Sequence, residues 1–129
     1  MAFLFFFIVS CSFLLAEDWN QFRGPAGQGH AEWNDLPVKW DRKNSVDWKT
    51  ELPGKAWSSP IMVGSSLVLT NAIEEEGGLA LEVLALDSVS GKKKWSVILF
   101  EHDDSPRIHK KNSHASPTPF YDGDRLFVH

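Results

Sequence analysis

The residues best suited to chemistry lie in one short basic segment, 107–114. It contains His109, Lys111 and Asn112, whose imidazole, ammonium and amide groups can donate hydrogen bonds to an anionic ligand such as a carboxylate. These three are the candidate ligand-binding residues. The alternative is structural: the amide group hydrogen-bonds the turn in which it lies, and the basic groups are solvated.

The same segment is poorly equipped to bind a metal ion. His109 and His114 are two imidazoles with no carboxylate partner beside them, whereas a zinc site needs three or four protein ligands. Cys11 is the only cysteine, so the chain after it has neither a thiolate ligand nor a disulfide. We therefore expect no metal site, and we assign no catalytic residue.

A predicted β-hairpin precedes this segment. Leu84 and Leu86 alternate with small or polar residues, which is typical of a half-buried strand. Asp87 can accept a hydrogen bond from the backbone two residues on, and Gly91 can adopt the positive φ that closes a tight turn. A second strand then leads to Trp95.

The hairpin is part of a longer repeat. Trp48 is followed by leucine four residues later, as Trp95 is, and a Ser-Pro pair follows each tryptophan, at 59–60 and at 116–117. The tryptophans are 47 residues apart and the Ser-Pro pairs 57, which indicates an insertion of ten residues between Phe100 and Ala115. The spacing is close to the roughly 40–50 residues of a propeller blade. The expected strands are 48–52, 59–63, 66–71, 81–87, 93–99, 116–120 and 125–129, with a loop at 74–78.

The run from Ala85 to Trp95 resembles the tryptophan-docking repeat, Ala-x-Asp-x-x-x-Gly-x-x-x-Trp, of pyrroloquinoline quinone (PQQ) dehydrogenase propellers. Residues 19–25, 57–60 and 109–119 resemble the start of exported bacterial PQQ-like-repeat proteins. The resemblance implies an all-β fold, a quinoprotein-dehydrogenase-like β-propeller of four-stranded antiparallel blades, with about one and a half blades present. It also implies structural blade anchors, in which each tryptophan packs between neighbouring blades: Trp48, Asp87, Gly91 and Trp95.

Three regions are expected along the chain. Residues 1–16 are apolar and uncharged but shorter than a bilayer span, which favours a signal peptide. The mature protein would then be periplasmic or secreted; a lipid anchor at Cys11 and a retained membrane anchor are the alternatives. Residues 17–47 form a loop-rich strap whose aromatic residues pack on the propeller: Trp19, Phe22, Trp33 and Trp40.

Residues 48–129 are the incomplete propeller repeats. We expect them to be the N-terminal part of a longer protein, and the alternative is a small independent β-domain. The composition, 43% hydrophobic and 23% charged, is that of a globular chain. A net charge of −4 without a dense basic face argues against a nucleic-acid partner.

The resemblance implies two possible functions. The first is an exported, non-catalytic binding or scaffold module for a small molecule or an envelope protein. The alternative is a PQQ- and Ca²⁺-dependent dehydrogenase that oxidises an alcohol or a sugar, in which His109, Lys111 and Asn112 would face the cofactor pocket. The sequence shows neither a recognisable Asp–Ca²⁺ constellation nor the adjacent cysteine pair of many such enzymes, so we favour the first.

Overall fold

The computed structural model describes residues 19–31, 37–41, 43–75 and 77–129. In this part of the chain the fold is all-β, with six strands and no helix, which confirms the predicted class. The predictions about the leader at 1–16, the anchor at Cys11 and the packing of Trp33 lie outside the described residues.

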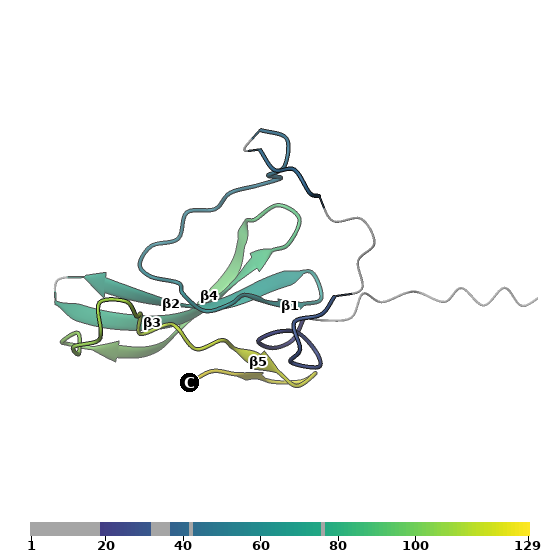
Figure 1. The fold of residues 1–129 in the computed structure, drawn as a ribbon. Helices are drawn as coiled ribbons and strands as arrows, with labels where there is room; N and C mark the ends of the chain where they lie inside the picture. Colours follow the sequence, from purple (N-terminus) through teal and green to yellow (C-terminus); the bar gives the residue numbers. More distant parts are fainter. Residues whose placement is uncertain (1–18, 32–36, 42, 76) are drawn as a thin grey trace, which may run out of the picture.

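The main sheet has four antiparallel strands in chain order. They are β1 (Ile61–Val63), β2 (Ser66–Glu75), β3 (Gly78–Asp87) and β4 (Lys93–His102). Two shorter strands, β5 (Phe120–Tyr121) and β6 (Leu126–Phe127), form a separate hairpin. Figure 1 shows this yellow hairpin on the opposite side of the main sheet from the blue segment that leads into β1.

The strands differ from the prediction in three main respects. The strand expected at 116–120 begins only at Phe120. β2 and β3 pair as far as Glu75 and Gly78, so the predicted loop at 74–78 is mostly strand. Residues 48–52 were expected to form a strand and do not. This segment lies across one face of the sheet and packs Trp48 and Leu52 against it.

Each face of the sheet has its own apolar core. On the face that we call the β6 face, Val68, Val83 and Ala85 are covered by side chains of the β5–β6 hairpin region. On the opposite face, the Trp48 face, Leu84 and its neighbours are covered by residues 48–56. Side chains alternate between the faces along each strand, so the two covers together bury the middle of β2 and β3 on both sides.

Trp19 and Asn20 join the two sheets. The Met62 N–H donates to the Trp19 carbonyl at 2.9 Å, and the Tyr121 N–H donates to the Asn20 carbonyl at 2.9 Å. The Asn20 side-chain amide also donates to the Tyr121 carbonyl at 2.9 Å. The start of the described chain is therefore fastened to β1 and β5 at once.

The strap packs less closely than expected. Trp19 is half-buried, but Phe22 and Trp40 are 56% and 73% exposed, so neither is buried against the sheet; packing of the strap on a propeller stays a prediction. The Arg23 guanidinium lies 5.3 Å from the centre of the Phe22 ring. That contact gives Phe22 a local partner in place of the sheet.

Candidate functional site

The most elaborate long-range contact joins Trp48 to the turn between β3 and β4. The Trp48 Nε1–H donates to the Ser88 carbonyl at 3.1 Å, and the indole lies so close to Gly91 that a Cβ there would overlap the ring. The Thr50 hydroxyl donates to the Gly91 carbonyl at 2.6 Å. Trp48 also packs on Leu84 and its apolar neighbours, so the indole is held on one side by the turn and on the other by the sheet.

The turn that receives Trp48 is closed by its own hydrogen bonds. The Asp87 carboxylate accepts the Ser90 hydroxyl at 2.7 Å and the Ser90 N–H at 2.8 Å. The Gly91 N–H donates to the Asp87 carbonyl at 2.8 Å, with Gly91 at φ +67°. Hydrogen bonds from the Ser90 hydroxyl and N–H hold the pKa of Asp87 below its usual range. The hydrogen bonds that close the turn thus come from its own residues and do not involve the indole.

Trp95 lies elsewhere. It pairs with Ala85 across β3 and β4, so its side chain is on the β6 face, opposite Trp48. It is 41% exposed. The structure therefore brings together Trp48, Asp87 and Gly91. The expected packing of Trp95 against an adjacent sheet is not found in the part of the chain that is described.

The candidate ligand residues share one exposed turn. The Asn112 N–H donates to the His109 carbonyl at 2.8 Å, and the Lys111 N–H donates to His109 Nδ1 at 3.2 Å. The Asn112 side-chain carbonyl accepts the Ser116 hydroxyl at 2.6 Å. All three residues are exposed, and none lines either cavity described below. Anion binding by this turn stays a prediction.

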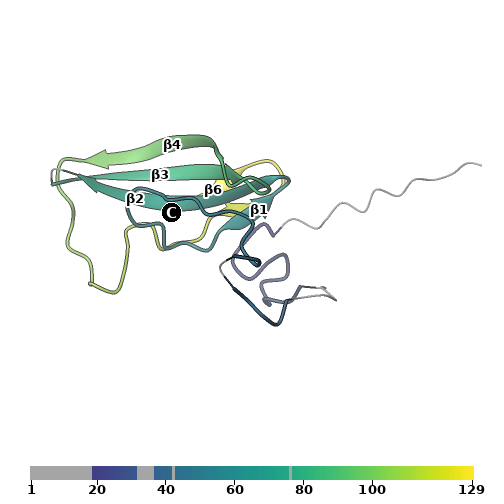
Figure 2. The same cartoon turned by 90° about the horizontal axis from the view of Figure 1, so that it is seen from above.

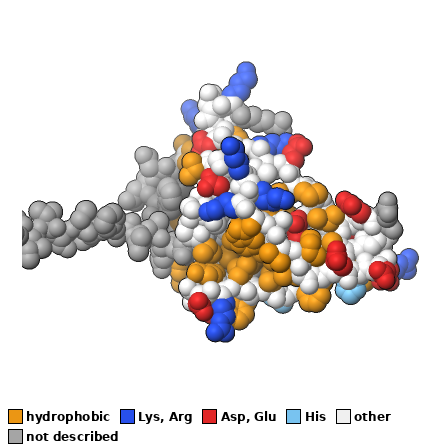
Figure 3. Space-filling model, turned by 180° about the vertical axis from the view of Figure 1, so that it is seen from behind, with side chains coloured by type: hydrophobic (Ala, Val, Ile, Leu, Met, Phe, Trp, Pro, Cys, Tyr) orange, Lys and Arg blue, Asp and Glu red, His pale blue; other side chains and the backbone are white. Residues whose placement is uncertain are grey.

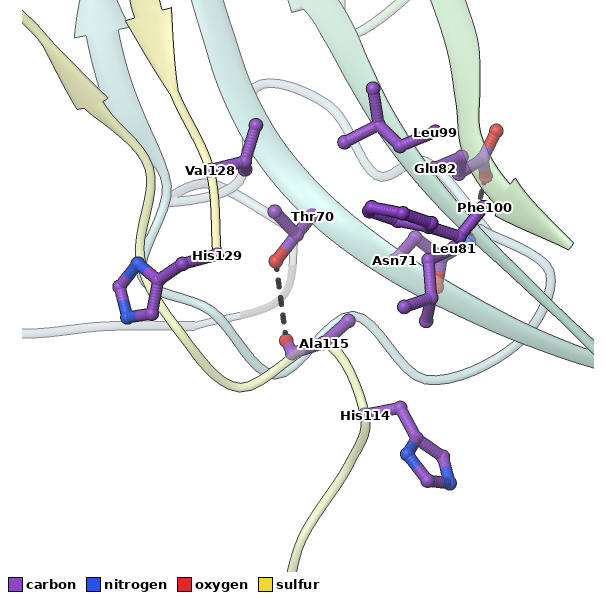
Figure 4. A pocket seen from close by; sticks show the side chains of 10 residues that line it. All are labelled: Thr70, Asn71, Leu81, Glu82, Leu99, Phe100, His114, Ala115, Val128 and His129. Carbon is purple, nitrogen blue, oxygen red and sulfur yellow. Dashed lines mark hydrogen bonds between the residues drawn. The ribbon is translucent and has the colours of Figure 1, made fainter. Parts of the chain in front are cut away.

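A small apolar cavity lies between the β6 face and the chain around Ala115 (Figure 4). Its volume is about 60 Å³, and its walls include Leu81, Leu99 and Phe100. The Thr70 hydroxyl in its lining is shared between the Ala115 and Pro117 carbonyls at 3.3 and 3.2 Å. A cavity of this size and character suits an apolar side chain or a very small apolar ligand. The sequence did not indicate it, because its walls come from five separate segments.

A wider and more polar hollow lies at the far end of the sheet, where the β2–β3 connection meets the end of β4. Its volume is about 490 Å³. Acidic groups on its lining include Glu75, Glu101 and Asp103. Even so, no group of three or more histidine, cysteine, aspartate or glutamate residues is placed to hold a metal ion within the described ranges.

A buried polar pair lies beneath the segment that carries Trp48. The Asn71 amide donates to the Glu82 carboxyl at 2.8 Å and to the Pro53 carbonyl at 2.6 Å. Both side chains are buried, and the Asn71 side-chain carbonyl oxygen has no hydrogen-bond partner among the residues that the structure describes. Sequence reasoning missed this pair because it depends on the register between β2 and β3. The pair ties the 48–56 segment to the sheet, which is a structural role.

Comparison of the chain with protein-family models, with curated proteins and with solved structures finds no match. Nor does the described part of the chain contain a helix with the length and apolar character needed to cross a membrane.

Proposed function

We propose that this chain supplies one blade, and part of a second, of a PQQ-like-repeat β-propeller that acts outside the cytoplasm as a non-catalytic binding or scaffold module. The observation that carries the proposal is the docking of Trp48 on the turn formed by Asp87 and Gly91. A tryptophan from one repeat seated on the Asp-x-x-x-Gly turn of the next is the contact that joins successive blades in such a ring.

Trp95 supports the same arrangement. It occupies the position in its repeat that Trp48 occupies in the preceding one, and it is partly exposed on the β6 face. The β5–β6 hairpin covers the β1 end of that face. Two further strands beside β6 would extend this cover over β4 and supply Trp95 with a turn like that of Asp87 and Gly91.

A non-catalytic role fits the chemistry of the described residues. The side chains that meet over long distances in the chain form turns, cores and strand pairs, and His109, Lys111 and Asn112 are outside both cavities. The alternative is the PQQ- and Ca²⁺-dependent dehydrogenase. It is favoured by one feature only, the basic turn at 109–112.

A chain-extension experiment tests the blade proposal. A copy of residues 71–99 is appended after His129. Residues 126–128 correspond to 67–69 in the repeat and His129 therefore to residue 70, so the added copy continues the second repeat in register. We expect acrylamide quenching of the Trp95 fluorescence, isolated by comparison with Trp95→Phe, to fall when the added turn is present. Quenching that is unchanged in a folded extended chain would contradict the blade arrangement.

A cofactor titration separates the two functions. We expect no change in the PQQ absorbance when the full chain is added with Ca²⁺, and no oxidation of alcohols or sugars with an artificial electron acceptor. A quinoprotein dehydrogenase serves as the positive control. A saturable change in the PQQ spectrum would favour the dehydrogenase.

A further inference from the structure

Within the described residues, the main sheet has one long edge that no strand covers. The strand order ends at β4, all ten residues of β4 are exposed, and Figure 2 shows β4 at the outer side of β3 and β2. An exposed edge strand presents unpaired N–H and C=O groups that can pair with another strand. The opposite edge differs, because β1 has three residues and its Met62 N–H already donates to the Trp19 carbonyl.

The middle of β4 is suited to strand pairing. Residues 95–100 contain no charge and no proline, and β-branched and aromatic side chains dominate them. Val97 and Phe100 are 52% and 61% exposed. A second strand alongside would supply these side chains with cross-strand neighbours.

Charges of opposite sign stand at the two ends of β4. Lys92, Lys93 and Lys94 precede the apolar stretch, and Glu101 and Asp103 follow it. Figure 3, which views the molecule from behind, shows basic side chains near the middle and acidic side chains toward the right, with hydrophobic side chains between them. This polarity makes the strand complementary to an antiparallel copy of itself and repulsive to a parallel one.

From this complementarity we propose that two copies of the chain associate edge to edge through antiparallel pairing of their β4 strands. A pairing centred on Val97 places Lys93 opposite Glu101 of the second copy, and the same contact recurs at the other end by symmetry. The two four-stranded sheets become one continuous sheet. This interface is independent of the function proposed above, because it uses the outer edge of β4 and neither face of the sheet.

Two irregularities limit the interface. The register between β3 and β4 shifts at two places and leaves Lys94 and Leu99 of β4 without a β3 partner. Bulges and edge lysines usually oppose edge pairing, but here the acids of the second copy neutralise the lysines. With the pairing centred on Val97, regular pairing is confined to residues 96–98, and the flanking charges meet beyond the bulges. Since the β1 edge is occupied by Trp19, the assembly closes as a dimer.

A charge-exchange experiment on the full chain tests the dimer by sedimentation equilibrium. Lys92→Glu/Lys93→Glu makes both ends of β4 acidic, and Glu101→Lys/Asp103→Lys makes both ends basic. We expect each variant alone to self-associate at least about tenfold more weakly than the native chain. An equimolar mixture of the two is expected to recover the native association as a heterodimer.

Lys43→Glu/Lys49→Glu is the matched control, since it makes the same change of charge on exposed residues away from β4, and it is expected to associate like the native chain. Circular dichroism verifies that each variant is folded. Equal association of all the proteins, as contact through the apolar segment 1–16 would produce, overturns the proposal. So does a native chain that stays monomeric at roughly 1 mM.

Discussion

The indole of Trp48 lies directly against Gly91, more than forty residues further along the chain, at a position where a side-chain Cβ would overlap the ring. Gly91 also has a positive φ of +67°, so two independent constraints require glycine there. The contact is completed by the hydrogen bonds from Trp48 to Ser88 and from Thr50 to Gly91. The predictions that follow start from this relationship.

Gly91→Ala should destabilise the fold by about 2–4 kcal/mol, because the added methyl group displaces the indole and the left-handed backbone disfavours alanine. Urea denaturation measures the change. Gly64→Ala is the matched control: it has a similar φ of +54°, with nothing within 4 Å of the added Cβ. We expect a loss of about 1 kcal/mol for Gly64→Ala, and equal losses at the two sites would contradict the Trp48 contact.

Trp48→Phe and Trp95→Phe should have unequal effects. The first removes the hydrogen bond to the Ser88 carbonyl and part of the apolar contact, at a cost of about 1–2 kcal/mol. The second changes a side chain that is 41% exposed and should cost less than about 0.5 kcal/mol. The same denaturation measurement compares them, and a larger loss for Trp95→Phe would reverse our assignment of the docked tryptophan.

The turn should weaken in acid through Asp87. Hydrogen bonds from Ser90 lower the pKa of Asp87 from its usual 3.8. Its contribution is therefore fully present above that usual value and is lost as the pH falls through the lower, folded pKa. We expect the stability difference between the native chain and Asp87→Asn to be largest near about pH 6 and to shrink by about pH 2.5.

The comparison with Asp87→Asn is needed because the pKa values of Asp41 and Asp122 are also lowered, by side-chain or backbone hydrogen bonds. Their contribution to acid sensitivity is the same in both proteins and cancels. A difference that stays constant across this range would show that the Asp87 carboxylate does not stabilise the turn.

Asn71→Ala should cost about 2–4 kcal/mol, because it leaves the Glu82 carboxyl and the Pro53 carbonyl without their donor in a buried site. Thermal and urea unfolding measure the loss. Asn112→Ala, at an exposed turn, is the control and should cost less than about 1 kcal/mol. A small effect at Asn71 would mean that the Asn71–Glu82 pair contributes little to holding the 48–56 segment on the sheet.

His109→Ala/Lys111→Ala tests the basic turn. If this turn holds an anionic ligand, the double variant should bind a polycarboxylate such as PQQ about tenfold more weakly than the native chain, with unchanged stability, because both side chains are exposed. Isothermal titration gives the affinity. His102→Ala/Lys49→Ala is the matched control. Identical binding by both variants would contradict a ligand-binding role for His109 and Lys111.

The β3–β4 hairpin was predictable because the alternation at Leu84 and Leu86, the acceptor at Asp87 and the glycine at Gly91 all indicate the same local structure. The outer ends of β2 and β3 were not predictable, because the polar glutamates from Glu74 onward do not show the pattern of a strand. These residues are in strands because β2 and β3 pair with each other. Residues 48–52 have a strand-like sequence, but they lie across one face of the sheet. Their apolar side chains pack on that face, and the segment does not form a strand.

Of the candidate site, sequence reasoning named Trp48, Asp87 and Gly91 but neither Thr50 nor the hydrogen bonds that complete the contact. The Ser88 carbonyl is a backbone group and has no signature in the sequence. The same applies to the Met62 and Tyr121 amides that fasten Trp19 and Asn20. Buried partners such as Asn71 and Glu82 become visible only when the strand register is known.

The fastening of Asn20 to Tyr121 spans 101 residues of chain. In a polypeptide that is synthesised from its amino end, Trp19 and Asn20 are the first of the described residues to appear. The Trp19 carbonyl can accept its hydrogen bond once β1 has been made, but the partner of Asn20 is complete only after β5 has been made. Such a distant closure is slow relative to hairpin formation. Among the described residues, Asn20 therefore precedes every strand in the chain, but its bonds to Tyr121 form only when five of the six strands have been made.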